Sequence, residues 1–229
     1  MGTFAEILWH EQASLPLLLI LQLLPLFGAA VVFAFKERPT AVIAGKVFAL
    51  AELLLCIVVV SRINPTVPGL QLAERFSPLA YHVAVDGISL VFLLLAALLT
   101  LLMTLYGMSR GMISPGRLFA VLLVAETGFI GMLVTVNIAW FAAFSALELW
   151  AVVYLLRRWA SSRAEIHALA RFIQYQSFGW LLFAMGCLVL GWAHAEATGG
   201  VWSFDLFDLA ATPPLGKFQT AAFYLLFYG

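Results

Sequence analysis

A single carboxylate stands in the middle of a long apolar segment. Glu126 lies in LVAETGFIGML, between Arg117 and Asn137, and the roughly 20 residues between these two polar positions are enough to cross a bilayer. A charged side chain at membrane depth is costly and is typical of a proton relay, an ion path or a buried structural pair. We therefore look for function inside the membrane, and a static structural pair stays open as the alternative for Glu126.

Other charged side chains also occupy apolar segments. Glu148 lies in FSALELWAVVY and Arg171 in ARFIQYQ, and with Glu126 they could form a chain of groups that passes protons. A cation such as Arg171 favours the charged form of a nearby carboxylate, so moving it would load or release a proton. Structural roles stay open for these residues too. Lys46 and Glu52 are six residues apart and do not share a helix face, so we expect them to contact a neighbouring subunit.

The composition indicates a polytopic membrane protein. Of the 229 residues, 64% are hydrophobic and only 10% are charged, whereas soluble domains are about half apolar and a quarter charged. The net charge of zero gives no support to nucleic-acid binding. Cys56 and Cys187 each lie in an apolar segment, so we interpret both as buried thiols. The sequence has no spacing typical of a metal, haem or other cofactor site, so we expect no cofactor in this chain.

Six apolar segments are long enough to cross a bilayer as helices. They cover residues 14–35, 40–61, 87–107, 117–136, 138–156 and 162–194. The last begins at Ser162-Arg163-Ala164-Glu165, a capping-box pattern that predicts a helix start. A seventh segment, 217–229, would reach only about 18 Å as a helix. We expect the sequence to stop inside a seventh helix, and a natural half-protein whose last helix finds a partner stays open as the alternative. The predicted fold class is an all-α polytopic membrane protein.

The distribution of Lys and Arg predicts the orientation. The loops after the first, third and fifth spans hold seven basic residues, and the alternate loops hold three. Because basic loops stay on the cytoplasmic side, we expect the N-terminus to face outward. The first residues lack the basic start of a cleavable signal peptide. The outer segment 62–86 contains Pro65, Pro68, Gly69 and Pro78, which predict turns or a short hairpin.

Several motifs occur in an order that resembles one family of membrane proteins. YHVAVDGISLVFLLLAALLTLL, from Tyr81, resembles the motif that opens the third helix of the antiporter-like subunits of respiratory complex I. LLVAETGFIGMLV resembles the fourth helix of that family in its subunit M branch. The pattern continues through NIAWFAAFSALELWAVVYLLRRWA, ARFIQYQSFGWLLF and ATGGVWSFDL. The resemblance covers roughly residues 70–229 and is specific, because the motifs keep the order and spacing of the family.

The resemblance implies an antiporter-like bundle of about 14 helices with two inverted repeats. This chain would hold the N-terminal half: the first three transmembrane helices with outer loop 62–86 in residues 1–116, and a partial repeat in residues 117–229. The implied function is proton translocation, driven by redox chemistry in partner subunits of an NADH-quinone oxidoreductase type of assembly. The chain would be a translocase subunit without catalytic residues, in the lipid bilayer of a bacterial cytoplasmic membrane, beside other membrane subunits.

The fifth helix departs from the family pattern. The family has a glutamate followed five residues later by a proline, and an ungapped comparison puts Ala146 and Ala151 at these positions. Glu148 lies two residues further on, turned by about 200°. Either the helix is locally rewound so that Glu148 serves the same site, or this half-channel has lost its principal carboxylate. Arg171 stands where the family commonly has lysine, and because arginine stays protonated it would act as a fixed charge.

Two further functions stay open from the sequence. The altered fifth helix is compatible with a divergent family member in an antiporter that also carries Na+, in a membrane hydrogenase or in an inorganic-carbon uptake complex. The second is a non-conducting scaffold subunit derived from a pump. In the first case the charged side chains inside the membrane could serve another ion, and in the second they would serve no transport at all.

Overall fold

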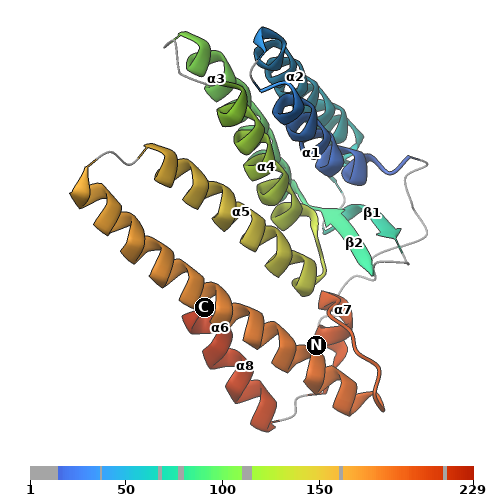
Figure 1. Cartoon of the computed structure of the whole chain (residues 1–229). Coiled ribbons are helices and arrows are strands. Elements are labelled where there is room, and N and C mark those ends of the chain that lie inside the picture. The colour runs from blue at the N-terminus through green and yellow to red at the C-terminus, as the bar shows by residue number, and fades with distance from the viewer. Residues whose placement is uncertain are drawn as a thin grey trace. The chain divides into compact units, whose positions relative to one another are not determined.

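The computed structural model describes residues 15–36, 38–66, 69–76, 80–109, 115–159, 162–213 and 216–229. These residues form eight helices and a two-stranded sheet (Figure 1). In chain order the elements are α1 (Leu17–Ala34), α2 (Pro39–Arg62), β1 (Gln71–Phe76), β2 (Tyr81–Val85), α3 (Gly87–Ser109), α4 (Pro115–Val134), α5 (Ile138–Trp159), α6 (Arg163–Ala197), α7 (Leu206–Ala211) and α8 (Gly216–Tyr228).

The helices α1 to α6 are each long and apolar enough to cross a membrane. This confirms the six predicted spans and the predicted helical membrane fold. The predicted seventh segment forms α8. The short helix α7 lies between α6 and α8, outside the predicted spans. The first residues, in which we expect no cleavable signal peptide, lie outside the described residues.

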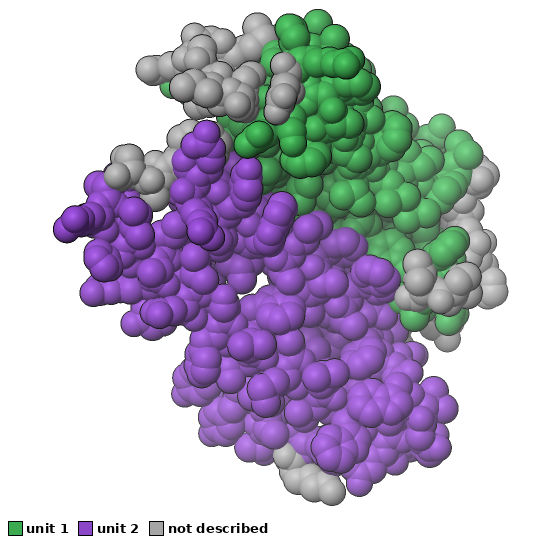
Figure 2. Space-filling view, in the orientation of Figure 1, with its two compact units in different colours: residues 1–134 green, residues 135–229 purple. Residues whose placement is uncertain are grey.

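The chain divides into two compact units, residues 1–134 and residues 135–229 (Figure 2). The first unit contains α1 to α4 and the strands, and the second contains α5 to α8. This division follows packing contacts. The predicted division at residue 116 marks where the repeat of the family is expected to begin. Packing contacts do not test that boundary, so it stays a prediction.

Local capping groups explain where several helices begin. Asp86 accepts the amide of Ser89 at 2.8 Å and caps α3. Asn137 accepts the amides of Ala139 and Trp140 and caps α5. Ser162 and Glu165 form the predicted capping box at the start of α6, with distances of 3.1 and 3.2 Å. Polar side chains thus satisfy the amide groups that a first helical turn leaves without a partner.

The outer segment of the first unit contains the antiparallel hairpin β1–β2, as predicted for residues 62–86. Glu74 pairs with Val83 and Phe76 pairs with Tyr81, and the register shifts between Gln71 and Glu74. Every residue of β2 is buried. The hairpin therefore has a packed face that attaches it to the helices instead of extending into solvent.

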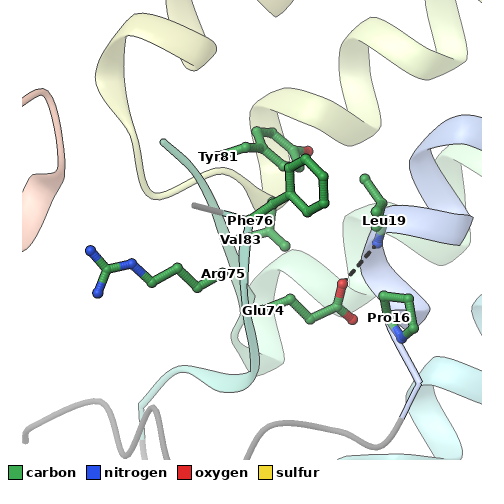
Figure 3. Close-up of a pocket in the computed structure, with 7 residues that line it drawn as sticks. All are labelled: Pro16, Leu19, Glu74, Arg75, Phe76, Tyr81 and Val83. Atoms are coloured by element: carbon green, nitrogen blue, oxygen red, sulfur yellow. Dashed lines mark hydrogen bonds between the residues drawn. The ribbon is translucent and has the colours of Figure 1, made fainter. Parts of the chain in front are cut away.

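Glu74 joins this hairpin to the first helix. Pro16 at the start of α1 provides no capping side chain. Instead, the Glu74 carboxylate accepts a hydrogen bond from the amide of Leu18 at 2.8 Å. It accepts a second one from the amide of Leu19 at 3.1 Å (Figure 3). A small pocket lies at this junction, lined by Pro16, Leu19, Glu74, Arg75, Phe76, Tyr81 and Val83. Burial raises the pKa of Glu74, and the α1 amides partly oppose that rise. Burial also raises the pKa of Tyr81, with a contribution from the Glu74 charge.

The core of the first unit lies among α1, α2 and α4. Small and large side chains alternate there, as in close packing between membrane helices. A Cβ atom on Gly28 would lie 2.6 Å from the Phe48 ring, so α1 and α2 approach closely at this point. The buried cluster consists of Ala29, Val32, Ala41, Phe119, Ala120 and Leu123.

In the second unit, α6 packs against both α5 and α8. The indole N–H of Trp180 donates to the carbonyl of Ala142 at 3.0 Å, which joins α6 to α5. The amide of Ile138 donates to the carbonyl of Phe204 at 2.9 Å, so the segment before α7 is held against the start of α5.

Candidate proton path

Glu126 lies in the middle of α4 and only 3% of its surface is exposed. Thr100 of α3 lies near its carboxyl group. Within the described part of the chain, both carboxyl oxygens of Glu126 are buried and have no hydrogen-bond partner. A static structural pair would supply such partners, because buried polar groups are normally hydrogen-bonded. The predicted proton-carrying role of Glu126 stays a prediction.

Glu52 is the residue whose surroundings differ most from our expectation. We predicted that it faces a neighbouring subunit, but it is 0% exposed in the middle of α2, inside the first unit. It lies close enough to Glu126 for their charges to interact. Both Glu52 oxygens are also buried without a hydrogen-bond partner among the described residues. Lys46, on the same helix, is only half-buried, and its predicted subunit contact stays a prediction.

Buried hydroxyl groups accompany these carboxylates. Thr104 of α3 donates to the carbonyl of Leu101, and Thr127 of α4 donates to the carbonyl of Leu123. Both side chains are almost fully buried. Both hydroxyl groups are thus satisfied within their own helices, whereas the Thr100 hydroxyl interacts with the Glu126 carboxyl group.

Glu148 and Arg171 belong to the second unit. Glu148 is half-buried on α5, and its Oε2 atom is buried without a hydrogen-bond partner within the described ranges. Arg171 is exposed on α6. The predicted action of Arg171 on a carboxylate therefore stays a prediction.

The described residues contain no group of three or more His, Cys, Asp or Glu side chains that could hold a metal ion.

No protein-family model matches the chain. Two curated relatives are similar to most of it. Subunit M of F(420)H(2) dehydrogenase from Methanosarcina mazei is 28% identical over 202 residues, which cover 86% of this chain and 40% of the relative. NAD(P)H-quinone oxidoreductase chain 4 from Gloeobacter violaceus is 27% identical over 217 residues, which cover 93% of this chain and 40% of the relative. The chain therefore spans about 40% of the length of these curated relatives.

Two solved structures share the fold. One is a chain of the membrane-bound sulfane sulfur reductase, an archaeal respiratory membrane complex, with a TM-score of 0.78 and 17% identity over 93% of this chain and 44% of that chain. The other is a chain of respiratory complex I from Thermus thermophilus, with a TM-score of 0.71 and 22% identity over 92% of this chain and 43% of that chain.

This chain is a homologue of the antiporter-like subunits of complex I-type assemblies. The resemblance of its motifs to that family is thus confirmed. Its six apolar helices also make it an integral membrane protein.

The fifth helix is regular at the two positions where the sequence departs from the expected family pattern. Ala151, at the position where the family pattern has proline, is fully buried, and α5 is an unbroken α-helix from Ile138 to Trp159. A regular helix turns Glu148 by about 200° from Ala146. The structure shows no rewinding of α5 around Glu148, and whether Glu148 or another group serves the proton path stays a prediction.

Sequence reasoning missed the proximity of Glu52 to Glu126. The available signal was that Glu52 stands in mid-span, as Glu126 does, with Cys56 one turn later on the same face. The partner could not be read from the sequence, because it depends on which helices pack together.

Proposed function

We propose that this chain forms part of a proton-translocating membrane subunit in a complex I-type assembly, with Glu126 as its main proton-carrying group. Redox energy arrives from partner subunits, as the names of the relatives suggest for those proteins. The observation that carries the proposal is the Glu126 carboxyl group, which is buried in the middle of a membrane-spanning helix and, among the described residues, interacts with the Thr100 hydroxyl but with no basic group.

Glu148 is a second proton carrier in this proposal, Arg171 acts as a fixed charge, and Lys46 contacts a neighbouring subunit. Glu148 has a smaller role than Glu126 because it is only half-buried. Replacing Glu148 with Gln separates two outcomes. Abolished pumping supports Glu148 as the substitute for the family glutamate, and near-normal pumping supports a path that no longer uses this helix.

The direct test uses the intact assembly in sealed membrane vesicles, supplied with the electron donor that it oxidises. Glu126→Gln keeps the size of the side chain and removes its titration. We expect proton uptake per electron to fall about tenfold or more, because positioned proton-transfer groups contribute factors of this size or larger. Glu165→Gln is the matched control, since Glu165 is exposed and Gln also fits a capping box. Normal pumping by an assembled Glu126→Gln variant would reject the proposal.

A second candidate function is favoured by the missing glutamate at Ala146 in the unbroken α5. A divergent subunit of an antiporter, hydrogenase or carbon-uptake complex would tolerate that change if its main ion path lay elsewhere. Transport that requires sodium or bicarbonate, with no dependence on quinone reduction, would support this alternative. A scaffold without conduction predicts that Glu126→Gln has no effect on transport.

We also propose that the N-terminus faces outward, in a bacterial cytoplasmic membrane. The support is the excess of basic residues in alternate loops. A cysteine introduced at the exposed Ser162 should react with an impermeant thiol reagent only from the cytoplasmic side. Reaction from the outer side alone would show that the N-terminus faces the cytoplasm.

A further inference from the structure

The contacts between α2 and α4 set a register between these helices. A Cβ atom on Gly116 would lie 3.1 Å from Cβ of Ala41, and a Cβ atom on Gly45 would lie 2.8 Å from Cδ2 of Phe119. Both contacts advance in the same direction along the two helices, so α2 and α4 run parallel. The offsets, 116 − 41 = 75 and 119 − 45 = 74, are nearly constant.

This register brings Glu52 and Glu126 to the same level. Each lies seven residues after a contacting residue, Gly45 in α2 and Phe119 in α4. Seven residues are close to two full turns, so each carboxylate lies on the contacting face of its helix. The offset 126 − 52 = 74 repeats that of the preceding contact. The electrostatic interaction between the two groups agrees with this placement.

Among the described residues of the first unit, no counter-charge lies at this level. The residues of α1 include no ionisable side chain, and Cys56 of α2 lies close enough to interact with both carboxyl groups. The other ionisable groups on α2, α3 and α4 lie six or more residues along their helices from Glu52, Thr100 or Glu126, and β2 lies beyond the membrane-spanning segment. These groups are Lys46 and Arg62 on α2, Tyr106 on α3, Arg117 on α4, and Tyr81 and His82 on β2.

We propose that Glu52 and Glu126 form a carboxyl–carboxylate pair that holds one shared proton between α2 and α4. Two full charges this deep in an apolar interior would be very costly, whereas one proton shared by the two groups leaves the pair with a single negative charge. Only a proton moves in this step, and no oxidant or reductant is needed.

This inference deepens the proposed function by naming Glu52 as a second group of the Glu126 site. The test is an equilibrium measurement on the intact assembly without electron donor, so it is separate from the pumping assay. Infrared absorption of protonated carboxyl groups is followed against pH in the wild type, Glu52→Gln and Glu126→Gln. The double variant is subtracted to remove all other carboxyl groups, and Glu165→Gln is the matched control that should leave the difference signal unchanged.

We expect the wild-type signal to disappear in two steps separated by more than about one pH unit, because interacting sites titrate as a pair. Each single variant should show one step, which lies between the two. A wild-type curve equal to the sum of the single-variant curves would overturn the pair. So would the absence of a protonated signal, or its loss when NaCl replaces choline chloride at fixed pH, which would indicate a sodium site.

Cys56 provides a second readout that leaves both carboxylates intact. Its Sγ atom lies 3.8 Å from the carbonyl of Leu93, within reach of an S–H hydrogen bond. The S–H stretching absorption should shift at both pH steps, and Cys56→Ala assigns the band against Cys187. A band that stays constant through the titration would contradict the shared proton even where a Gln variant fails to assemble. A shared proton with normal pumping in Glu126→Gln would reject the proposed function and leave the pair standing.

Discussion

The two units of this chain place their intramembrane carboxylates in different surroundings. In the first unit, Glu52 and Glu126 are almost completely buried in a four-helix core. In the second unit, Glu148 is half-buried on α5. The two spans themselves differ in burial in the same way. In the α4 span 61% of the residues are buried within the structure, and in the α5 span 11% are buried.

This comparison shows that depth in an apolar segment does not by itself decide the role of a carboxylate. Glu126 and Glu148 both stand in the middle of a predicted span. Glu126 has helices on several sides and another carboxyl group nearby, whereas much of the α5 surface is left for lipid or for other protein. Coupling between titratable groups requires both burial and proximity.

Disturbing the register of the first unit should have the largest effect. Gly45→Leu places a side chain where even a Cβ atom would lie 2.8 Å from the Phe119 ring. We expect it to cost about 1–3 kcal/mol or more by overpacking, and to merge the two carboxyl titration steps. Gly87→Leu is the control, because a Cβ atom there meets nothing within 4 Å.

Each unit has one buried cysteine for this measurement, Cys56 in the first and Cys187 in the second. Their rates of thiol labelling report local opening of each unit separately. Gly45→Leu should accelerate labelling at Cys56 and leave Cys187 unchanged. Equal acceleration in both variants would show that the α2–α4 contact has no special role.

Replacing a carboxylate by an apolar side chain in each unit tests whether the difference in burial has an energetic consequence. Glu52→Met lets Glu126 keep the proton alone, which removes the negative charge of the pair from the apolar core, so we expect the first unit to gain about 1–3 kcal/mol. Glu148→Met should change the second unit much less, because water or lipid headgroups reach a half-buried group. Labelling of Cys56 and Cys187 measures the two free energies. Destabilisation by Glu52→Met would mean that its carboxyl group has favourable partners.

The contact between the hairpin and α1 should have a smaller effect. Glu74→Ala removes the acceptor of the Leu18 and Leu19 amides, and we expect a loss of about 1 kcal/mol in the first unit. Hydrogen exchange should show faster exchange at these two amides. Because burial raises the pKa of Glu74 above its ordinary value of 4.5, the folded state holds the proton more tightly. Its contribution to stability is therefore full below pH 4.5 and declines as the pH rises through the folded-state pKa.

Glu74→Gln separates the two parts of this effect. The amide keeps an acceptor for α1 but does not titrate, so the decline in stability above pH 4.5 should vanish. A decline that persists in Glu74→Gln would assign the pH dependence to another group.

The smallest effect is expected at the cap of α3. Asp86→Ala should cost about 0.5–1 kcal/mol, and Asp86→Asn only a few tenths, since Asn is also a good cap. The Ser89 hydroxyl and amide hold the pKa of Asp86 below its ordinary value of 3.8, so its stabilisation is present above pH 3.8 and is lost as the pH falls through the folded-state pKa. Exchange of the Ser89 amide measured against pH checks both statements. Equal exchange in all three proteins would show that the cap is not needed.

Local properties of the sequence determined the spans and several helix starts. The six apolar segments became six helices, and Ser162 with Glu165 formed the predicted capping box. These features depend on residues within one or two turns of each other, so neighbouring side chains are sufficient to predict them. The hairpin was predictable for the same reason, from the proline and glycine residues in segment 62–86.

Tertiary structure alone decided which distant groups meet. Glu74 caps a helix that begins more than 50 residues earlier, and Glu52 lies beside Glu126 of another helix. Both contacts depend on which faces of two separated elements pack together. The hydrophobicity of the sequence cannot specify these faces, because most faces of these helices are apolar. The small residue Gly45 against the Phe119 ring sets the α2–α4 register, and through it two separate glutamates become one site.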